Sequence, residues 1–123
     1  MISMTTLDED NPYMQQLQSQ APGPITLINT FLAPKGQVEE VVAVWSRDAA
    51  YMKECKGFIS TQLYGSEAGG RILTNIAVWE SVQDLRNAFQ NPDFQEKLSA
   101  YPDGTVAHPA VMRKLAVENI CEA

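Results

Sequence analysis

The chain has 123 residues and a mass of 13.6 kDa, the size of one domain with a single hydrophobic core. Hydrophobic residues make up 45% and charged residues 20%, which excludes a collagen, a coiled coil and a wholly disordered protein. Nine basic against fifteen acidic side chains give a formal charge of -6, so electrostatics disfavour nucleic acid and anionic membranes as partners. No apolar run in the sequence is long enough to span a membrane.

The cysteine and histidine content argues against a thiolate or imidazole metal site. Cys55 and Cys121 are the only cysteines and His108 is the only histidine, and their spacing does not match that of metal ligands. A magnesium site made only of carboxylates stays open. The two cysteines, and the lack of a basic residue before Lys35, predict a reduced, cytoplasmic protein without a signal peptide.

The first 24 residues differ in composition from the rest of the chain. They hold four glutamines, three acidic residues and no basic residue, and they end in an Ala-Pro-Gly-Pro break. We expect residues 1–24 to form a flexible N-terminal arm, with a short helix around Met14 and Leu17, and residues 25–123 to form the folded domain. The arm is either a disordered end or a segment that packs on a neighbouring subunit.

From Ile25 onward the sequence alternates between strand and helix patterns. Apolar residues recur at alternating spacings of four and three from Val38 to Met52, which indicates a helix that ends at Gly57. A loop with two glycines joins the second and third strands as an antiparallel hairpin. Apolar runs rich in β-branched residues predict four strands, over residues 25–32, 58–64, 72–79 and 108–118.

A second helical region follows the third predicted strand. Ser81 and Asp84 form a capping box at its start, and Asn91-Pro92 interrupts the helix and starts a short second one. The order strand, helix, strand, strand, helix, strand is that of an α+β, ferredoxin-like domain. Such a βαββαβ domain covers one face of a four-stranded antiparallel sheet with two helices.

The third predicted strand, residues 72–79, is mostly apolar on both of its faces. Helices cover only one face of the expected sheet, so the other face would expose apolar side chains. An exposed apolar face favours association with a second copy of the chain. We therefore expect a homodimer that packs through its sheet faces.

Two asparagines stand inside the two most apolar strands, although asparagine is depleted in strands and costly to bury unpaired. If the odd-numbered residues of both strands face the helices, Asn29, Asn75 and the indole of Trp79 converge on one space. Neutral amides there could hold a carbonyl, phenol or peroxide oxygen. The alternative is that each amide binds a neighbouring backbone group or a buried water.

Asp48 lies on the flank of the apolar stripe of the first helix rather than on its outer face. A carboxylate that is partly desolvated beside a cavity has a raised pKa and can take a proton from an acidic phenol or enol. The alternative is an ion pair with Arg113 or a position at the edge of the helix in water.

Three further side chains are candidates for substrate binding. His108 could be a general base or lie exposed at the entrance of a strand. Tyr51 and Tyr64 carry phenols that can reach a pocket or extend into solvent. The glycine-rich and nucleophile motifs of dinucleotide, nucleoside triphosphate and hydrolase sites are absent from the sequence.

Several segments together resemble the antibiotic biosynthesis monooxygenase family of dimeric α+β barrel proteins. They are KGQVEE at 35–40, KGFIS at 56–60, NIAVWES at 75–81, and the NPDF, YPDG and AHPA motifs within 91–110. The resemblance implies a monooxygenase that works with neither metal nor organic cofactor. Its substrate would be a small electron-rich aromatic compound, a phenol, anthrone or quinol, which dioxygen converts to a quinone.

The resemblance also assigns roles to residues. Polyketide-oxidising members use an asparagine and, four residues later in the third strand, a tryptophan, and Asn75 and Trp79 match this pair. By resemblance they position the substrate oxygen and stabilise a peroxide, while the arginine of those enzymes has no match here. Haem-degrading relatives carry an asparagine where Asn29 stands, but Leu98 and Ala88 occupy the positions of their histidine and tryptophan, so haem is not expected.

Three other functions stay open at this point. The same pocket would serve a non-catalytic homodimer that binds a hydrophobic small molecule. The fold would also suit a pure oligomerisation module, or an isomerase or decarboxylase that uses Asp48 or His108.

Overall fold

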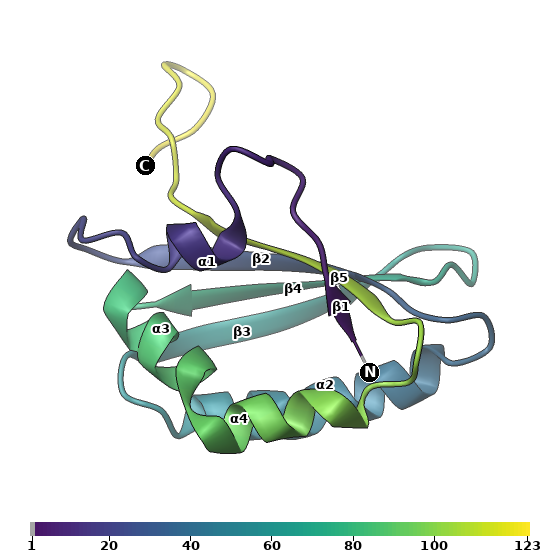
Figure 1. Ribbon diagram of the computed structural model, residues 1–123. Helices are drawn as coiled ribbons and strands as arrows, with labels where there is room; N and C mark the ends of the chain where they lie inside the picture. Colours follow the sequence, from purple (N-terminus) through teal and green to yellow (C-terminus); the bar gives the residue numbers. More distant parts are fainter. Residues whose placement is uncertain (1) are drawn as a thin grey trace.

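The computed structural model describes residues 2–123 and contains a five-stranded sheet with helices on one face (Figure 1). The order of the strands in the sheet is β1-β5-β2-β4-β3. The β1–β5 pair is parallel, and the other three pairs are antiparallel. The strands are β1 (Ser3–Met4), β2 (Ile25–Leu32), β3 (Phe58–Gly65), β4 (Ile72–Trp79) and β5 (Val106–Met112).

The ferredoxin-like α+β class is confirmed, but the expected four-stranded antiparallel sheet is wrong in one respect. Residues of the N-terminal segment add β1 as a fifth, parallel strand at the edge of β5. The amide of Ser3 donates to the carbonyl of Thr105 at 2.9 Å, and the amide of Thr5 donates to the carbonyl of Ala107 at 2.8 Å. These bonds satisfy backbone groups that an uncovered edge strand would leave unpaired.

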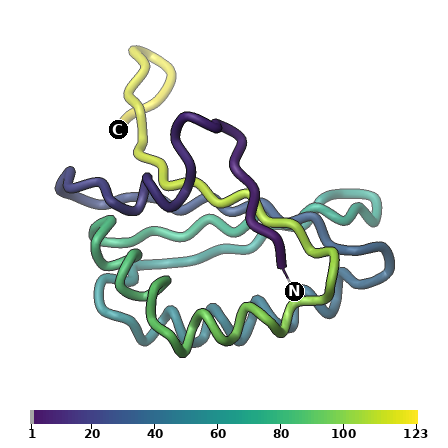
Figure 2. Tube along the Cα trace, viewed as in Figure 1, coloured from purple at the N-terminus to yellow at the C-terminus, as the bar shows by residue number. Residues whose placement is uncertain are grey.

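The helices begin where the sequence signals predict. The Ser81 hydroxyl accepts from the amide of Asp84 at 3.1 Å, and the Asn91 side chain accepts from the amide of Asp93 at 2.9 Å, so both caps are confirmed. Helices α2 and α4 lie next to each other under the sheet (Figure 2). The helices are α1 (Tyr13–Gln16), α2 (Val38–Lys53), α3 (Val82–Gln90), α4 (Pro92–Lys97) and the 3-10 turn η1 (Leu98–Ala100).

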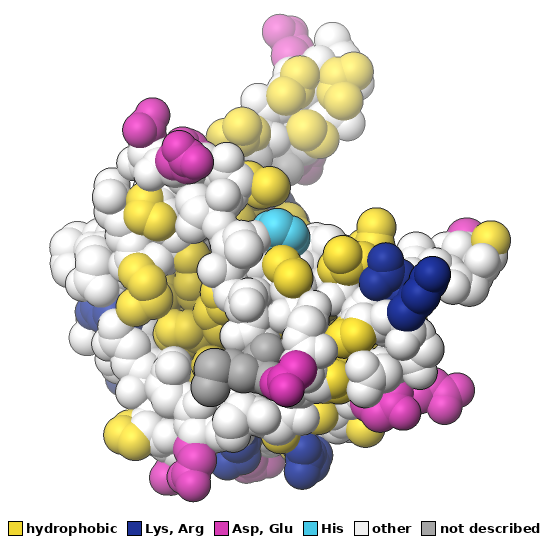
Figure 3. Space-filling model, turned by 45° about the vertical axis from the view of Figure 1, so that its right-hand side comes forward, with side chains coloured by type: hydrophobic (Ala, Val, Ile, Leu, Met, Phe, Trp, Pro, Cys, Tyr) yellow, Lys and Arg dark blue, Asp and Glu magenta, His cyan; other side chains and the backbone are white. Residues whose placement is uncertain are grey.

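The last strand is shorter than expected and begins earlier. The sequence predicts residues 108–118, whereas β5 runs from Val106 to Met112. Its partner β2 begins at Ile25, and the register pairs Thr26 with Met112, so β5 has no neighbour to pair with beyond that point. Residues 113–123 stand away from the sheet as a hook with hydrophobic side chains exposed along it (Figure 3).

The sheet has a covered face and an open face. Odd-numbered residues of β2 and β4 face the helices as predicted, and Ile25 and Trp79 are each 1% exposed. The open face exposes large apolar side chains of four strands, namely Leu32, Tyr64, Ile72 and Met112. Over residues 2–123, no helix combines the length and apolar character needed to cross a membrane.

Candidate functional site

A cavity of about 70 Å³ lies between the covered face of the sheet and the helices. It is several times the roughly 10–15 Å³ that one water molecule requires, so this part of the core is not tightly packed. Its walls are mostly apolar and aromatic. Four polar side chains line it, namely Asn29, Asp48, Thr61 and Asn75, together with the phenols of Tyr13 and Tyr101.

The pairing of β2 with β4 brings the two asparagines together. Asn29 and Asn75 are direct cross-strand partners in this register, and both belong to the odd-numbered residues that face the helices. Directly opposite side chains of an antiparallel pair have Cβ atoms about 4.5–5.5 Å apart. Trp79 lies on the same face of β4, four residues after Asn75 and beyond Ala77, and it lines the same cavity. The predicted convergence of these three side chains is therefore present in the structure.

Hydrogen bonds orient the two amides differently. The Thr61 hydroxyl donates to Oδ1 of Asn75 at 2.5 Å, which leaves the Asn75 NH₂ group as the donor available to a ligand. Oδ1 of Asn29 is buried and has no hydrogen-bond partner within residues 2–123. A buried acceptor without a partner is costly, so it favours a ligand that donates a hydrogen bond.

Asp48 is the acidic group of the cavity and is only 6% exposed. The Tyr101 hydroxyl donates to its Oδ2 at 2.9 Å, while its Oδ1 is buried without a partner in the described chain. Burial raises the pKa of Asp48 to about 6, and the Tyr101 hydrogen bond and the charges of Arg47 and Lys97 limit that rise. The carboxylate can therefore hold or release a proton near neutral pH.

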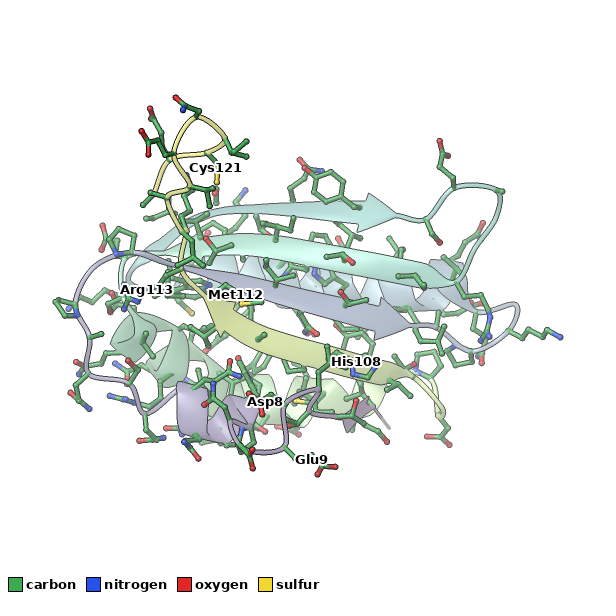
Figure 4. The ribbon with its side chains drawn as sticks, turned by 90° about the horizontal axis from the view of Figure 1, so that it is seen from above. Asp8, Glu9, His108, Met112, Arg113 and Cys121 are labelled. Carbon is green, nitrogen blue, oxygen red and sulfur yellow. The ribbon has the colours of Figure 1, made fainter. Side chains whose placement is uncertain are left out.

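The alternative that Asp48 pairs with Arg113 is not observed. The Arg113 guanidinium instead donates to backbone carbonyls of residues 21–24, including that of Ala21 at 2.9 Å (Figure 4). Arg113 therefore holds the Ala-Pro-Gly-Pro break against the end of β5 and plays no part in the cavity.

Tyr51, Tyr64 and His108 do not line the cavity. The Tyr51 hydroxyl donates to the carbonyl of Ala88 at 3.3 Å, beside a second pocket lined by residues of α2 and α3. Tyr64 lies on the open sheet face and is 55% exposed. His108 points to the same open face, because it occupies an even position of β5, and its Nδ1 is 2.6 Å from the Thr5 hydroxyl (Figure 4).

Two polar residues of the cavity have no signal in the sequence. Thr61 sits in a strand of mixed pattern, and only the pairing of β3 with β4 brings it beside Asn75. Tyr101 follows η1, and its contact with Asp48 spans 53 positions of the chain. Within the part of the chain that the structure describes, no group of three or more His, Cys, Asp or Glu side chains could hold a metal ion.

The fold and the cavity define a ferredoxin-like α+β domain with a mostly apolar cavity between its sheet and its helices. The family model described as antibiotic biosynthesis monooxygenase matches residues 24–97, and the chain belongs to this family. The resemblance inferred from the sequence motifs is thereby confirmed. A search of the curated proteins finds no match.

Solved structures of similar fold include proteins of the same kind. SnoaB, a cofactor-independent oxygenase from Streptomyces nogalater, is 23% identical with a TM-score of 0.71, covering 79% of this chain and 98% of that one. A protein of Shewanella loihica PV-4, described as a candidate monooxygenase, is 30% identical with a TM-score of 0.66, covering 79% of this chain and 99% of that one. These comparisons support a monooxygenase-like function for the chain.

Proposed function

We propose that the protein is a cofactor-independent monooxygenase that oxidises a small electron-rich aromatic compound, a phenol or quinol, to a quinone with dioxygen. The observation that carries the proposal is the meeting of Asn75, Trp79 and Asp48 in one largely apolar cavity. The family match supports the reaction class, and SnoaB is itself a cofactor-independent oxygenase.

In this proposal Asp48 acts as the general base. A buried carboxylate with a pKa of about 6 is ionised at neutral pH and accepts the proton of an acidic phenol or enol through its unpaired Oδ1. The resulting anion is electron-rich and passes an electron to dioxygen. Removing this proton inside an apolar cavity therefore starts the oxidation without a cofactor.

Two uncharged hydrogen-bond donors then stabilise the oxygen atoms of the substrate and of the peroxide. The Asn75 NH₂ group and the Trp79 indole N–H can hold the substrate oxygen and the developing peroxide without adding charge. The substrate radical and superoxide combine through a new carbon–oxygen bond to form the peroxide. Its O–O bond then breaks as the hydrogen on the same carbon is lost, which gives the quinone and water, so one oxygen atom of dioxygen enters the ring and the other leaves in water. The substrate supplies the four electrons that dioxygen accepts.

Incubation with and without oxygen tests the reaction class. We expect the protein to convert a panel of single-ring phenols and quinols to quinones in air, with one dioxygen consumed per quinone, and to leave them unchanged under nitrogen. Quinone absorbance and an oxygen electrode measure both quantities. Tight binding of the same compounds without turnover in air would contradict the proposal and favour a non-catalytic binder.

We also propose a homodimer through the open sheet face. That face exposes Leu32, Tyr64, Ile72 and Met112, with exposed fractions between 38% and 55%, across four neighbouring strands. Large apolar side chains exposed on one sheet face favour association. Sedimentation equilibrium should give twice the 13.6 kDa mass of the chain, and a monomer at micromolar concentration would contradict this proposal.

A further inference from the structure

The N-terminal segment (residues 2–17) forms one wall of the cavity. Ile2, Met4 and Tyr13 line it together with side chains of the sheet and the helices. The family match begins at residue 24, so this wall lies outside the part of the chain that the family model describes. Figures 1 and 2 show the segment running beside β5 before it reaches α1.

Tyr13 is the aromatic residue by which this segment lines the cavity. Its side chain is 6% exposed, and its ring meets that of Phe89 edge-on with centroids 5.2 Å apart. Phe89 belongs to α3 and lines the same cavity. Burial raises the pKa of the Tyr13 phenol well above its usual range, so the group is neutral and suits an apolar wall. The ring of Tyr13 therefore closes the cavity against α3.

Two elements hold this wall in place. The amide of Val111 in β5 donates to Oε1 of Gln16 at 2.6 Å, and the guanidinium of Arg86 in α3 donates to the carbonyl of Leu17 at 2.8 Å. The Leu17 side chain is fully buried in the same core cluster but does not line the cavity. The segment thus bridges the sheet edge and α3, which fixes the position of Tyr13 between them.

We propose that Tyr13 is a specificity-determining residue, whose ring limits the site to small ring systems. A cavity of about 70 Å³ is smaller than the roughly 150 Å³ of a cavity that binds one benzene molecule, so it has no room for fused rings. The side chain that bounds it on this side comes from outside the matched family region. Shortening Tyr13 would open the space between β5 and α3 to further rings. The catalytic meaning of this inference rests on the proposed function, whereas its prediction for ligand size rests on the cavity alone.

Binding under anaerobic conditions tests the inference independently of turnover. Calorimetric titrations with phenol, 1-naphthol and 1-hydroxyanthraquinone compare one, two and three fused rings in the parent and in Tyr13→Ala. We expect the variant to improve the affinity for the three-ring compound relative to phenol by at least about tenfold, as pockets discriminate by such factors. If Tyr13→Ala folds poorly, Tyr13→Leu replaces it, because leucine keeps an apolar contact in the core. Its ratio of three-ring to phenol affinity should lie between those of the parent and a fully opened site.

Three matched variants separate a change of cavity size from a loss of packing. Tyr13→Phe keeps the ring and should keep the parent's preference. Met14→Ala, an exposed neighbour in α1, should change nothing. Leu17→Ala loosens the same segment without removing a cavity wall, so it should lower thermal stability while the size preference stays.

The outcomes are distinct. Three outcomes would overturn the inference. The ratio of three-ring to phenol affinity could stay unchanged in a folded Tyr13→Ala or Tyr13→Leu variant. It could shift equally in Leu17→Ala, or none of the ring compounds could bind. A shifted ratio in binding, with no oxygen-dependent turnover by the parent, would leave the inference standing and remove the proposed function instead.

Discussion

Replacement of Asp48 by asparagine is expected to lower kcat/KM about 10²–10⁴-fold, the range that a positioned general base contributes. The variant keeps the shape and the Tyr101 hydrogen bond but has no carboxylate to accept a proton. Steady-state oxygen uptake with a single-ring quinol measures the effect. Glu40→Gln, an exposed acid of the same helix, is the control and should retain parental activity.

The pH dependence of kcat/KM identifies the group that acts as the base. Because the base must be ionised, kcat/KM should rise with pH through about 6, the raised pKa of Asp48. Tyr101→Phe removes a hydrogen bond that lowers this pKa, so the rising limb should move to higher pH. A limb that stays in place in Tyr101→Phe, or an Asp48→Asn variant with parental activity, would exclude Asp48 as the base.

Stability should respond to pH through the same carboxyl group. A carboxyl whose pKa is raised on folding binds its proton more tightly in the native state, so its contribution to stability is fully present below about pH 4. That contribution is lost as pH rises through about 6. Denaturant unfolding at several pH values should show this loss in the parent and not in Asp48→Asn.

Replacement of Asn75 by alanine is expected to lower kcat about 10²–10³-fold, the cost of removing one donor to a developing oxyanion. Binding of substrate should change less, because the amide acts mainly on charge that appears during the reaction. The truncation leaves the Thr61 hydroxyl without its acceptor, so we also expect a stability loss of about 1 kcal/mol. Single-turnover quinone formation and equilibrium unfolding measure the two effects.

Thr61→Val provides the matched control for Asn75. It keeps the amide but removes the hydrogen bond that orients it, so kcat should fall less than in Asn75→Ala. If Thr61→Val is as impaired as Asn75→Ala, the orientation of the amide accounts for its whole contribution. If Asn75→Ala turns over at the parental rate, Asn75 has no role in the oxygen chemistry.

The sequence by itself was sufficient for the elements that depend on local chemistry. Capping at Ser81 and Asn91, and the period of two in β2 and β4, are set by near neighbours in the chain, and the structure shows both. The same period placed Asn29, Asn75 and Trp79 on one face. The start of β5, and therefore the sheet face to which the His108 side chain points, could not be predicted from local patterns. The extent of a strand depends on where its neighbouring strand begins.

Tertiary structure decided which polar groups meet. The register of β2 against β4 makes Asn29 and Asn75 direct partners, and a shift by one residue would have sent one of them to the open face. The bond from Tyr101 to Asp48 and the cavity wall built by Tyr13 join segments far apart in the chain. Such contacts depend on how whole elements pack against each other, so they cannot be predicted from the residue pattern within one segment.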